Sequence, residues 1–88
     1  MAPKKKRFEF KILAPEAGQV LLSGNFNDWS DTSDPMKRDE TGGWKKTKVL
    51  PQGTYEYKFI VDGVWILDPN CPNSVLNEYG TYNSVIEL

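Results

Sequence analysis

Apolar and polar residues alternate most regularly over residues 54–61, and this pattern predicts a β-strand. The dipeptide Asp62-Gly63 follows, and a second apolar run starts at Val64. Asp and Gly tolerate the positive φ angles of a type I′ turn, so the two runs are predicted to form a two-residue β-hairpin. Since side chains alternate along a strand, one face of this hairpin is expected to pack in the core through Tyr55, Tyr57, Phe59 and Val61.

The two-residue turn determines the register of the hairpin. With this loop length, Val61 pairs with Val64 and Ile60 pairs with Trp65. Trp65 then falls on the face away from the core, diagonal to Lys58. A large indole beside an ammonium group on an outer face requires an explanation other than core packing.

The remaining sequence is typical of short strands separated by turns. Strands are predicted over residues 8–13 from clear alternation, over 19–23 from a continuous apolar run, over 44–50 despite poor alternation, and over 81–88, with Pro, Gly and Asn marking the turns. The apolar strand 19–23 is expected at the centre of a sheet, the lysine-rich strand 44–50 at an edge, and residues 68–79 in a loop. No segment has the pattern of a helix. We therefore predict an all-β, immunoglobulin-like antiparallel sandwich, with a single domain over residues 8–88.

Charge is unevenly placed along this chain of 88 residues, whose net charge is −1. Residues 1–7 are expected to form a basic, disordered tail; the run 3–7 resembles a short nuclear-import signal, but a solvated tail is the preferred interpretation. This tail holds four of the eleven Lys and Arg residues, which leaves seven basic against twelve acidic residues in 8–88. That balance argues against nucleic acid as a partner.

The expected compartment is the cytoplasm. No apolar run is long enough for a transmembrane helix, and no hydrophobic segment follows the N-terminal charges as in a signal peptide. A single cysteine, Cys71, cannot form an internal disulfide. We therefore expect no membrane partner.

Catalysis is not expected from this composition. The chain has no histidine and no glycine-rich phosphate loop, and Cys71 has no evident base beside it, so an inert thiol is expected. The acidic residues of 28–34 lack the spacing of an EF-hand, which favours a solvated acidic loop over a calcium site. We expect no cofactor and no metal.

Aromatic and amide side chains outside the expected core are more informative. Trp29 lies in a polar loop, where it could either plug the core or stay exposed, whereas Trp44 is expected to pack in the core or at an edge. A sugar ring has an apolar face of C–H groups and a rim of hydroxyls. A flat aromatic surface with nearby donors and acceptors suits such a ligand.

At these residues the chain resembles a carbohydrate-binding module, the glycogen- and starch-binding family 48, which occurs in the beta subunits of AMP-activated protein kinase. Similar modules precede the catalytic domains of glucan branching and debranching enzymes. The resemblance rests on three stretches in the family's order: Leu-Ser-Gly-Asn-Phe-Asn-Asp-Trp-Ser at 22–30, Gly-Thr-Tyr-Glu-Tyr-Lys-Phe-Ile-Val-Asp-Gly at 53–63, and Gly-Thr-Tyr-Asn-Ser-Val-Ile at 80–86. Trp65 and Asp68-Pro69 lie between the second and the third.

The resemblance implies a non-catalytic β-sandwich that binds α-1,4-linked glucan such as glycogen, starch or maltooligosaccharides. By this resemblance two tryptophans stack on glucose rings, while a lysine, a threonine and an asparagine bond to hydroxyls. A tyrosine stands where kinase-linked members have a leucine, and its ring is expected to stack laterally. The implied binding residues are Trp29, Lys58, Trp65, Tyr79, Thr81 and Asn83.

Two other functions stay open at this stage. The exposed aromatic residues could instead dock a partner protein, which would make the chain a regulatory module for a glucan-metabolising enzyme or a kinase. The chain could also be the detached N-terminal module of such an enzyme.

Overall fold

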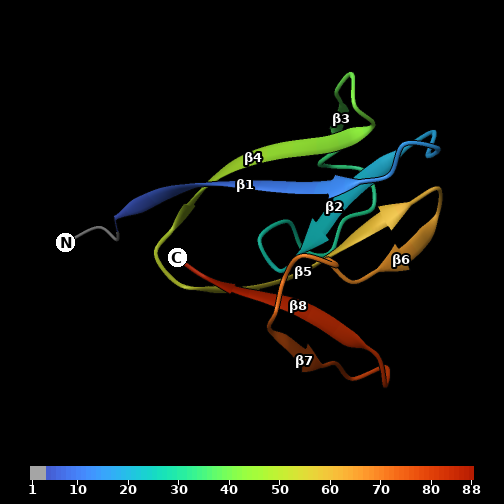
Figure 1. Cartoon of the computed structure of the whole chain (residues 1–88). Helices are drawn as coiled ribbons and strands as arrows, with labels where there is room; N and C mark the ends of the chain where they lie inside the picture. Colours follow the sequence, from blue (N-terminus) through green and yellow to red (C-terminus); the bar gives the residue numbers. More distant parts are fainter. Residues whose placement is uncertain (1–3) are drawn as a thin grey trace.

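The computed structural model describes residues 4–88, and these form two antiparallel sheets that pack as a small sandwich (Figure 1). The all-β prediction is therefore confirmed. One sheet has the order β1-β4-β3; the other has the order β2-β5-β8-β7, with β6 also paired to β5. None of the elements in this part of the chain is a helix that could cross a membrane. The strands are β1 Lys5–Leu13, β2 Val20–Gly24, β3 Lys37–Arg38, β4 Gly43–Pro51, β5 Thr54–Val61, β6 Val64–Ile66, β7 Ser74–Leu76 and β8 Tyr82–Glu87.

The β5–β6 hairpin has the predicted register. Ile60 lies opposite Trp65, and both turn residues have positive φ, 48° at Asp62 and 83° at Gly63. The Asp62 carboxylate also accepts hydrogen bonds from the backbone N–H groups of Gly18 and Gln19, each at 2.9 Å. The aspartate therefore does more than permit the turn, because it ties the hairpin to the turn before β2.

The inner face of β5 forms the centre of the core through Tyr57 and Phe59, as predicted, whereas Tyr55 and Val61 on the same face are only half-buried. Tyr57 and Phe59 are fully buried, and the Tyr57 ring meets that of Phe10 on β1 edge to face, with centroids 4.9 Å apart. Ile60 is buried as well, although it belongs to the outer face. It lies directly between Leu21 of β2 and Trp65 of β6, which flank it on the same face.

The predicted edge position of β4 is wrong, since β4 lies between β1 and β3. Alternation places Lys46 and Lys48 on the same face as the buried Trp44, toward the other sheet. Both ammonium groups approach the carboxylate of Asp34, at 3.7 Å and 3.1 Å. Asp34 is only 5% exposed, so it does not belong to a solvated acidic loop. The buried Asp34, which comes from the loop before β3, pairs with Lys46 and Lys48 and so allows these lysines on an inner strand. The local pattern had assigned them to an edge strand.

The predicted central position of β2 is also wrong, because β2 ends the strand order of its sheet. Its free edge is covered by residues 34–36. Leu22 donates its N–H to the Asp34 carbonyl at 2.9 Å, and Met36 donates to the Val20 carbonyl at 2.8 Å. β2 therefore has backbone partners along both edges, and its side chains are buried except for the half-buried Leu21, which fits its continuous apolar run.

The structure adds a strand to those predicted and begins β1 three residues earlier. The segment expected to be a loop, 68–79, contains β7, which pairs with β8. β1 begins at Lys5 instead of at residue 8, so residues 5–7 pair with residues 49–51 of β4. Those three residues therefore belong to the sheet and not to a disordered tail, while residues 1–3 lie outside the described part of the chain.

Two hydrogen bonds hold the segment after β6 against the sheet. The Tyr57 hydroxyl donates to the Asp68 carboxylate at 2.6 Å, and the Asp68 N–H donates to the Ser84 hydroxyl on β8 at 3.0 Å. Burial of the phenol, together with the hydrogen bond and negative charge of Asp68, raises the pKa of Tyr57 well above its usual range. The phenol thus stays protonated and keeps donating.

Replacing Tyr57 with Phe tests this contact. We expect Tyr57→Phe to lower the free energy of unfolding by about 2 kcal/mol, because a buried hydrogen bond to a charged group is lost. The matched control is Tyr55→Phe, whose hydroxyl donates to the exposed Pro51 carbonyl and should cost about 0.5 kcal/mol. Urea unfolding measures both, and equal losses would contradict the assignment.

The raised pKa also predicts a dependence on pH. The stabilisation from Tyr57 is complete below the unfolded-state pKa of about 10 and is lost as the pH rises above it. The stability of the parent should therefore fall more steeply above pH 10 than that of Tyr57→Phe.

Candidate functional site

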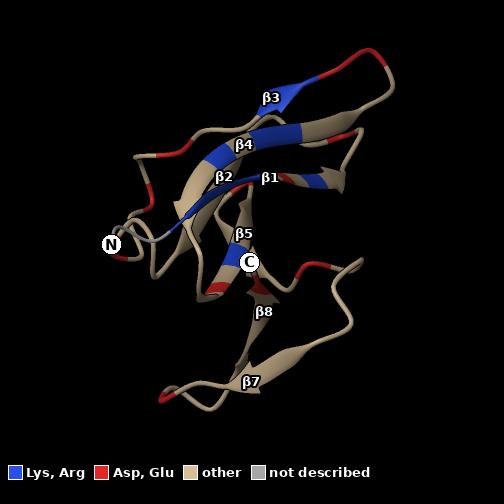
Figure 2. Ribbon diagram, turned by 90° about the vertical axis from the view of Figure 1, so that its left-hand side faces the viewer, with Lys and Arg blue, Asp and Glu red and all other residues tan. Residues whose placement is uncertain are grey.

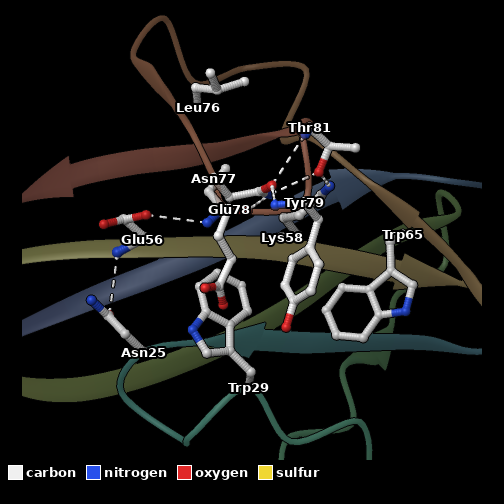
Figure 3. A pocket seen from close by; sticks show the side chains of 11 residues that line it. Asn25, Trp29, Glu56, Lys58, Trp65, Leu76, Asn77, Glu78, Tyr79 and Thr81 are labelled. Atoms are coloured by element: carbon white, nitrogen blue, oxygen red, sulfur yellow. Dashed lines mark hydrogen bonds between the residues drawn. The ribbon is translucent and has the colours of Figure 1, made fainter.

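A groove of about 800 Å³ lies over the outer face of β5, between the loop after β2, strand β6 and the loop between β7 and β8 (Figure 3). This volume falls within the range of about 300–1,000 Å³ that is usual for small-molecule sites. All six residues named from the sequence line the groove. The complete lining is Asn25, Trp29, Glu56, Lys58, Trp65, Leu76, Asn77, Glu78, Tyr79, Thr81 and Asn83.

The backbone that presents Trp29 is strained. Asp28 and Trp29 both have φ of 57°, a region that bulky residues rarely adopt. The side chain of Asn27 compensates: its oxygen accepts from the N–H of Gly24 at 3.1 Å, and its NH₂ group donates to the Leu22 carbonyl at 3.1 Å. Such strain persists only where the surrounding contacts hold it, and here it turns a tryptophan toward the groove.

Gly24 permits this loop to lie close to β5. A Cβ atom at Gly24 would come within 2.6 Å of the Glu56 carbonyl oxygen and of the Phe26 ring. The Phe26 ring in turn packs on Phe10 of the core, with centroids 5.5 Å apart. The Gly-Asn-Phe-Asn-Asp-Trp sequence is therefore a loop in which the glycine allows close packing, Phe26 plugs the core and Asn27 supports the backbone.

Asp34 connects this loop to the other sheet. Its carboxylate accepts from the Asn27 NH₂ group at 2.8 Å and pairs with Lys48 at 3.1 Å. Burial opposes ionisation of Asp34, but the hydrogen bonds from Asn27 and Lys48 and the charges of Lys48 and Lys46 outweigh it, so the pKa of Asp34 is lowered. The charged carboxylate is thus part of the support for Trp29.

Three aromatic side chains meet in the groove. Figure 3 shows the Tyr79 ring in view between the indoles of Trp29 and Trp65. Trp65 is 43% exposed and Tyr79 is 83% exposed, while Trp29 is half-buried. Trp44, in contrast, is in the core, with its indole N–H donating to the Ala14 carbonyl at 2.9 Å. Trp29 and Trp65 therefore belong to the groove, whereas Trp44 belongs to the core.

Asn77 organises the polar side of the groove. Its oxygen accepts from the N–H groups of Tyr79 and Thr81, at 2.9 Å and 3.1 Å. Its NH₂ group donates to the Thr81 hydroxyl at 2.7 Å and to the Asn83 oxygen at 3.0 Å. The Lys58 ammonium also approaches the Thr81 hydroxyl, at 3.4 Å. With two donors directed at its oxygen, that hydroxyl has its own proton free to donate.

Asn83 is more enclosed than the other residues named from the sequence. It is 6% exposed, its oxygen accepts from Asn77, and its NH₂ group donates to a Glu56 carboxylate oxygen at 3.1 Å. Both ends of this amide thus have partners within the protein. Glu56, half-buried beside it, brings a carboxylate to the groove.

Several lining residues were not singled out from the sequence as site residues. Alternation along β5 could have identified Glu56, because it shares the outer face with Lys58. The Asn-Glu-Tyr-Gly turn sequence could have indicated the role of Asn77, since Asn side chains often bond to backbone groups two residues on. The others, Asn25, Leu76 and Glu78, come from loops and a strand end that only the fold brings to the groove.

Comparisons of the sequence with known proteins identify a matching family. Residues 7–88 match the family model described as the glycogen recognition site of AMP-activated protein kinase. The chain is 40% identical over 70 residues to the 5'-AMP-activated protein kinase subunit beta-1 of Sus scrofa, and also to that of Rattus norvegicus. It is 39% identical over 70 residues to subunit beta-2 of Mus musculus.

These matches cover 80% of the chain but only part of each relative. The matched region spans 54% of the Sus scrofa sequence, 24% of the Rattus norvegicus sequence and 25% of the Mus musculus sequence. The similarity therefore concerns one module of those proteins.

Acid should loosen the loop that carries Trp29. Because the pKa of Asp34 is lowered, its contribution is present above the unfolded-state pKa of about 4 and is lost as the pH falls below it. We expect the Trp29 backbone amide resonance, followed by NMR from pH 7 to pH 2, to shift in the parent and to change little in Asp34→Asn. Asp31→Asn, which alters an exposed acid of the same loop, should behave like the parent. An unchanged acid response in Asp34→Asn would refute this role.

Proposed function

The chain belongs to the family of glycogen-recognition modules of AMP-activated protein kinase, and on this premise we propose that its groove binds α-1,4-linked glucan by aromatic stacking and hydroxyl hydrogen bonds. The observation that carries the proposal is the meeting of Trp29, Tyr79 and Trp65 in one groove beside a row of polar side chains. These aromatic residues come from three separate segments of the chain. Core packing explains neither the exposure of Trp65 nor that of Tyr79.

The aromatic rings supply the stacking surfaces of this model. A pyranose places its C–H face on an indole or a phenol, and each such contact contributes about 1–2 kcal/mol by comparison with other aromatic stacking. The strained loop and the pairing of Trp65 with Ile60 fix the backbone of both tryptophans before any ligand arrives. Little ordering is then needed on binding.

The polar residues complete the recognition of hydroxyl groups. Lys58 donates to hydroxyl oxygens, and the free proton of the Thr81 hydroxyl can be donated as well. Glu56 supplies the acceptor for hydroxyl protons. In this model Asn83 acts mainly by holding Glu56, since both of its amide atoms already have partners.

The charges of the groove favour a neutral ligand. Its lining contains one cationic residue, Lys58, and two acidic residues, Glu56 and Glu78. A phosphorylated ligand would meet a net negative surface, whereas an uncharged glucan would not. Because the groove is open and has few polar contacts, we expect a dissociation constant for a short oligosaccharide on the order of micromolar to millimolar.

Loss of the Trp65 ring should abolish retention on glycogen. Trp65→Ala removes one stacking surface, worth about 1–2 kcal/mol, which is a large share of a weak affinity. Affinity electrophoresis of the purified chain through glycogen measures the effect without any other protein present. The matched control is Tyr82→Ala, which removes an aromatic ring that is 51% exposed but outside the groove and should leave retention unchanged. Parental retention of Trp65→Ala would reject the stacking model.

Lys58→Gln should weaken the binding of maltoheptaose several-fold in calorimetry, because a charged donor is replaced by a neutral one. The control is Lys45→Gln, which removes the same charge from the other sheet and should not change the affinity. If both variants bind like the parent, Lys58 is only a solvated strand residue.

A further inference from the structure

Positive charge is concentrated on the sheet that does not carry the groove (Figure 2). Nine of the eleven Lys and Arg residues lie in β1, β3 and β4, and Glu9 is the only acidic residue in these strands. Lys58 is the only basic residue in the strands of the other sheet. The nine are Lys5, Lys6, Arg7, Lys11, Lys37, Arg38, Lys45, Lys46 and Lys48.

The strand register aligns three of these lysines. Lys11 of β1 lies directly opposite Lys45 of β4, and Lys45 lies directly opposite Lys37 of β3. All three are exposed, and alternation places them on the outer face, since their neighbours Ile12 and Trp44 are buried inward. We call Lys11, Lys45 and Lys37 the lysine row. Like charges directly opposite each other destabilise a sheet, so the row costs stability in the free protein.

Acidic side chains compensate this row only in part. The one ion pair of the row within residues 4–88 joins Lys45 to Asp39 at 3.8 Å. Asp39 is already bonded to the N–H groups of Thr41 and Gly43, and Glu9 is the one acid on the same face of β1. By contrast, the inward-facing lysines of β4 both pair with Asp34. The lysine row therefore presents positive charge to an external ligand.

We propose that the lysine row docks an acidic segment of a partner protein. Negative side chains on that segment would relieve the repulsion between the three lysines and pair with each of them. Adjacent strands are about 4.8 Å apart, so the row spans only about 10 Å and suits a short peptide stretch. Exposed Val49 and Leu13 lie on the same outer face, at 59% and 69% exposure, and offer apolar contact beside the charges.

The same surface is a poor fit for an extended polyanion. The chain carries eleven basic and twelve acidic residues, and nearly all of the acidic ones lie outside β1, β3 and β4, so an extended nucleic acid or an anionic membrane would meet repulsion beyond the row. Glucan is neutral and gains nothing from the row. No residue of the row lines the groove, so a glucan and an acidic segment can be bound together.

Fluorescence anisotropy with a labelled synthetic peptide of alternating Glu and Val tests the proposal. We expect saturable binding by the 88-residue chain that weakens as salt is added. The double variant Lys11→Gln/Lys37→Gln should bind about fivefold more weakly, from the loss of two exposed ion pairs. The matched control, Lys4→Gln/Lys6→Gln, removes the same charge from exposed residues outside the row and should change the affinity by less than about twofold.

Each outcome decides the proposal. Equal weakening in both double variants would assign the binding to general charge and overturn the row as a site. So would an absence of binding by the parent, or tighter binding of duplex DNA or phosphatidylserine vesicles than of the peptide. The single variant Lys37→Gln, on the two-residue strand β3, should weaken binding in the same direction if the double variant folds poorly.

Discussion

The two-residue period of β5 is the constraint on which the rest of the molecule depends. Burial of Tyr57 and Phe59 against the other sheet forces Glu56 and Lys58 onto the outer face. A slip of one residue would exchange these two sets and lose both the core and the groove. Trp65 of β6 pairs with Ile60, which shares the outer face of β5 with Lys58. Trp65 therefore lies on the same outer face as Lys58 and not inside the sandwich.

The groove also depends on a buried charge that belongs to neither the core nor the ligand surface. Asp34 receives a hydrogen bond from Asn27 in the loop of Trp29 and pairs with lysines on the opposite sheet. Buried ion pairs contribute little net stability, because desolvation offsets the attraction between the charges. In some proteins such pairs specify one arrangement of the chain. Here that arrangement holds the loop and its strained tryptophan in place.

The two faces of the sandwich offer different chemistry. The groove side combines exposed aromatic rings with two carboxylates and one lysine, which suits a neutral ligand rich in hydroxyls. The opposite sheet carries most of the Lys and Arg residues, and Glu9 is the single acidic residue in its strands β1, β3 and β4 (Figure 2). The two surfaces share no side chain, so the neutral ligand and the acidic segment proposed above would not compete.

Local rules were sufficient for the hairpin, the core face of β5 and the all-β class, because the alternation and the turn chemistry act between near neighbours. The register alone therefore placed Trp65 diagonal to Lys58 on the outer face. The set of six residues that the fold brings into one groove came from the resemblance to a known family, not from local rules. Local rules failed for β4, whose inward lysines depend on an acid some twelve or more residues away, and for β2, whose free edge is covered by residues 34–36. They also could not show that Asn83 has internal partners at both ends of its amide. Each of these features joins segments that are far apart in the sequence. No local sequence pattern links such segments, so only the tertiary structure shows that they meet.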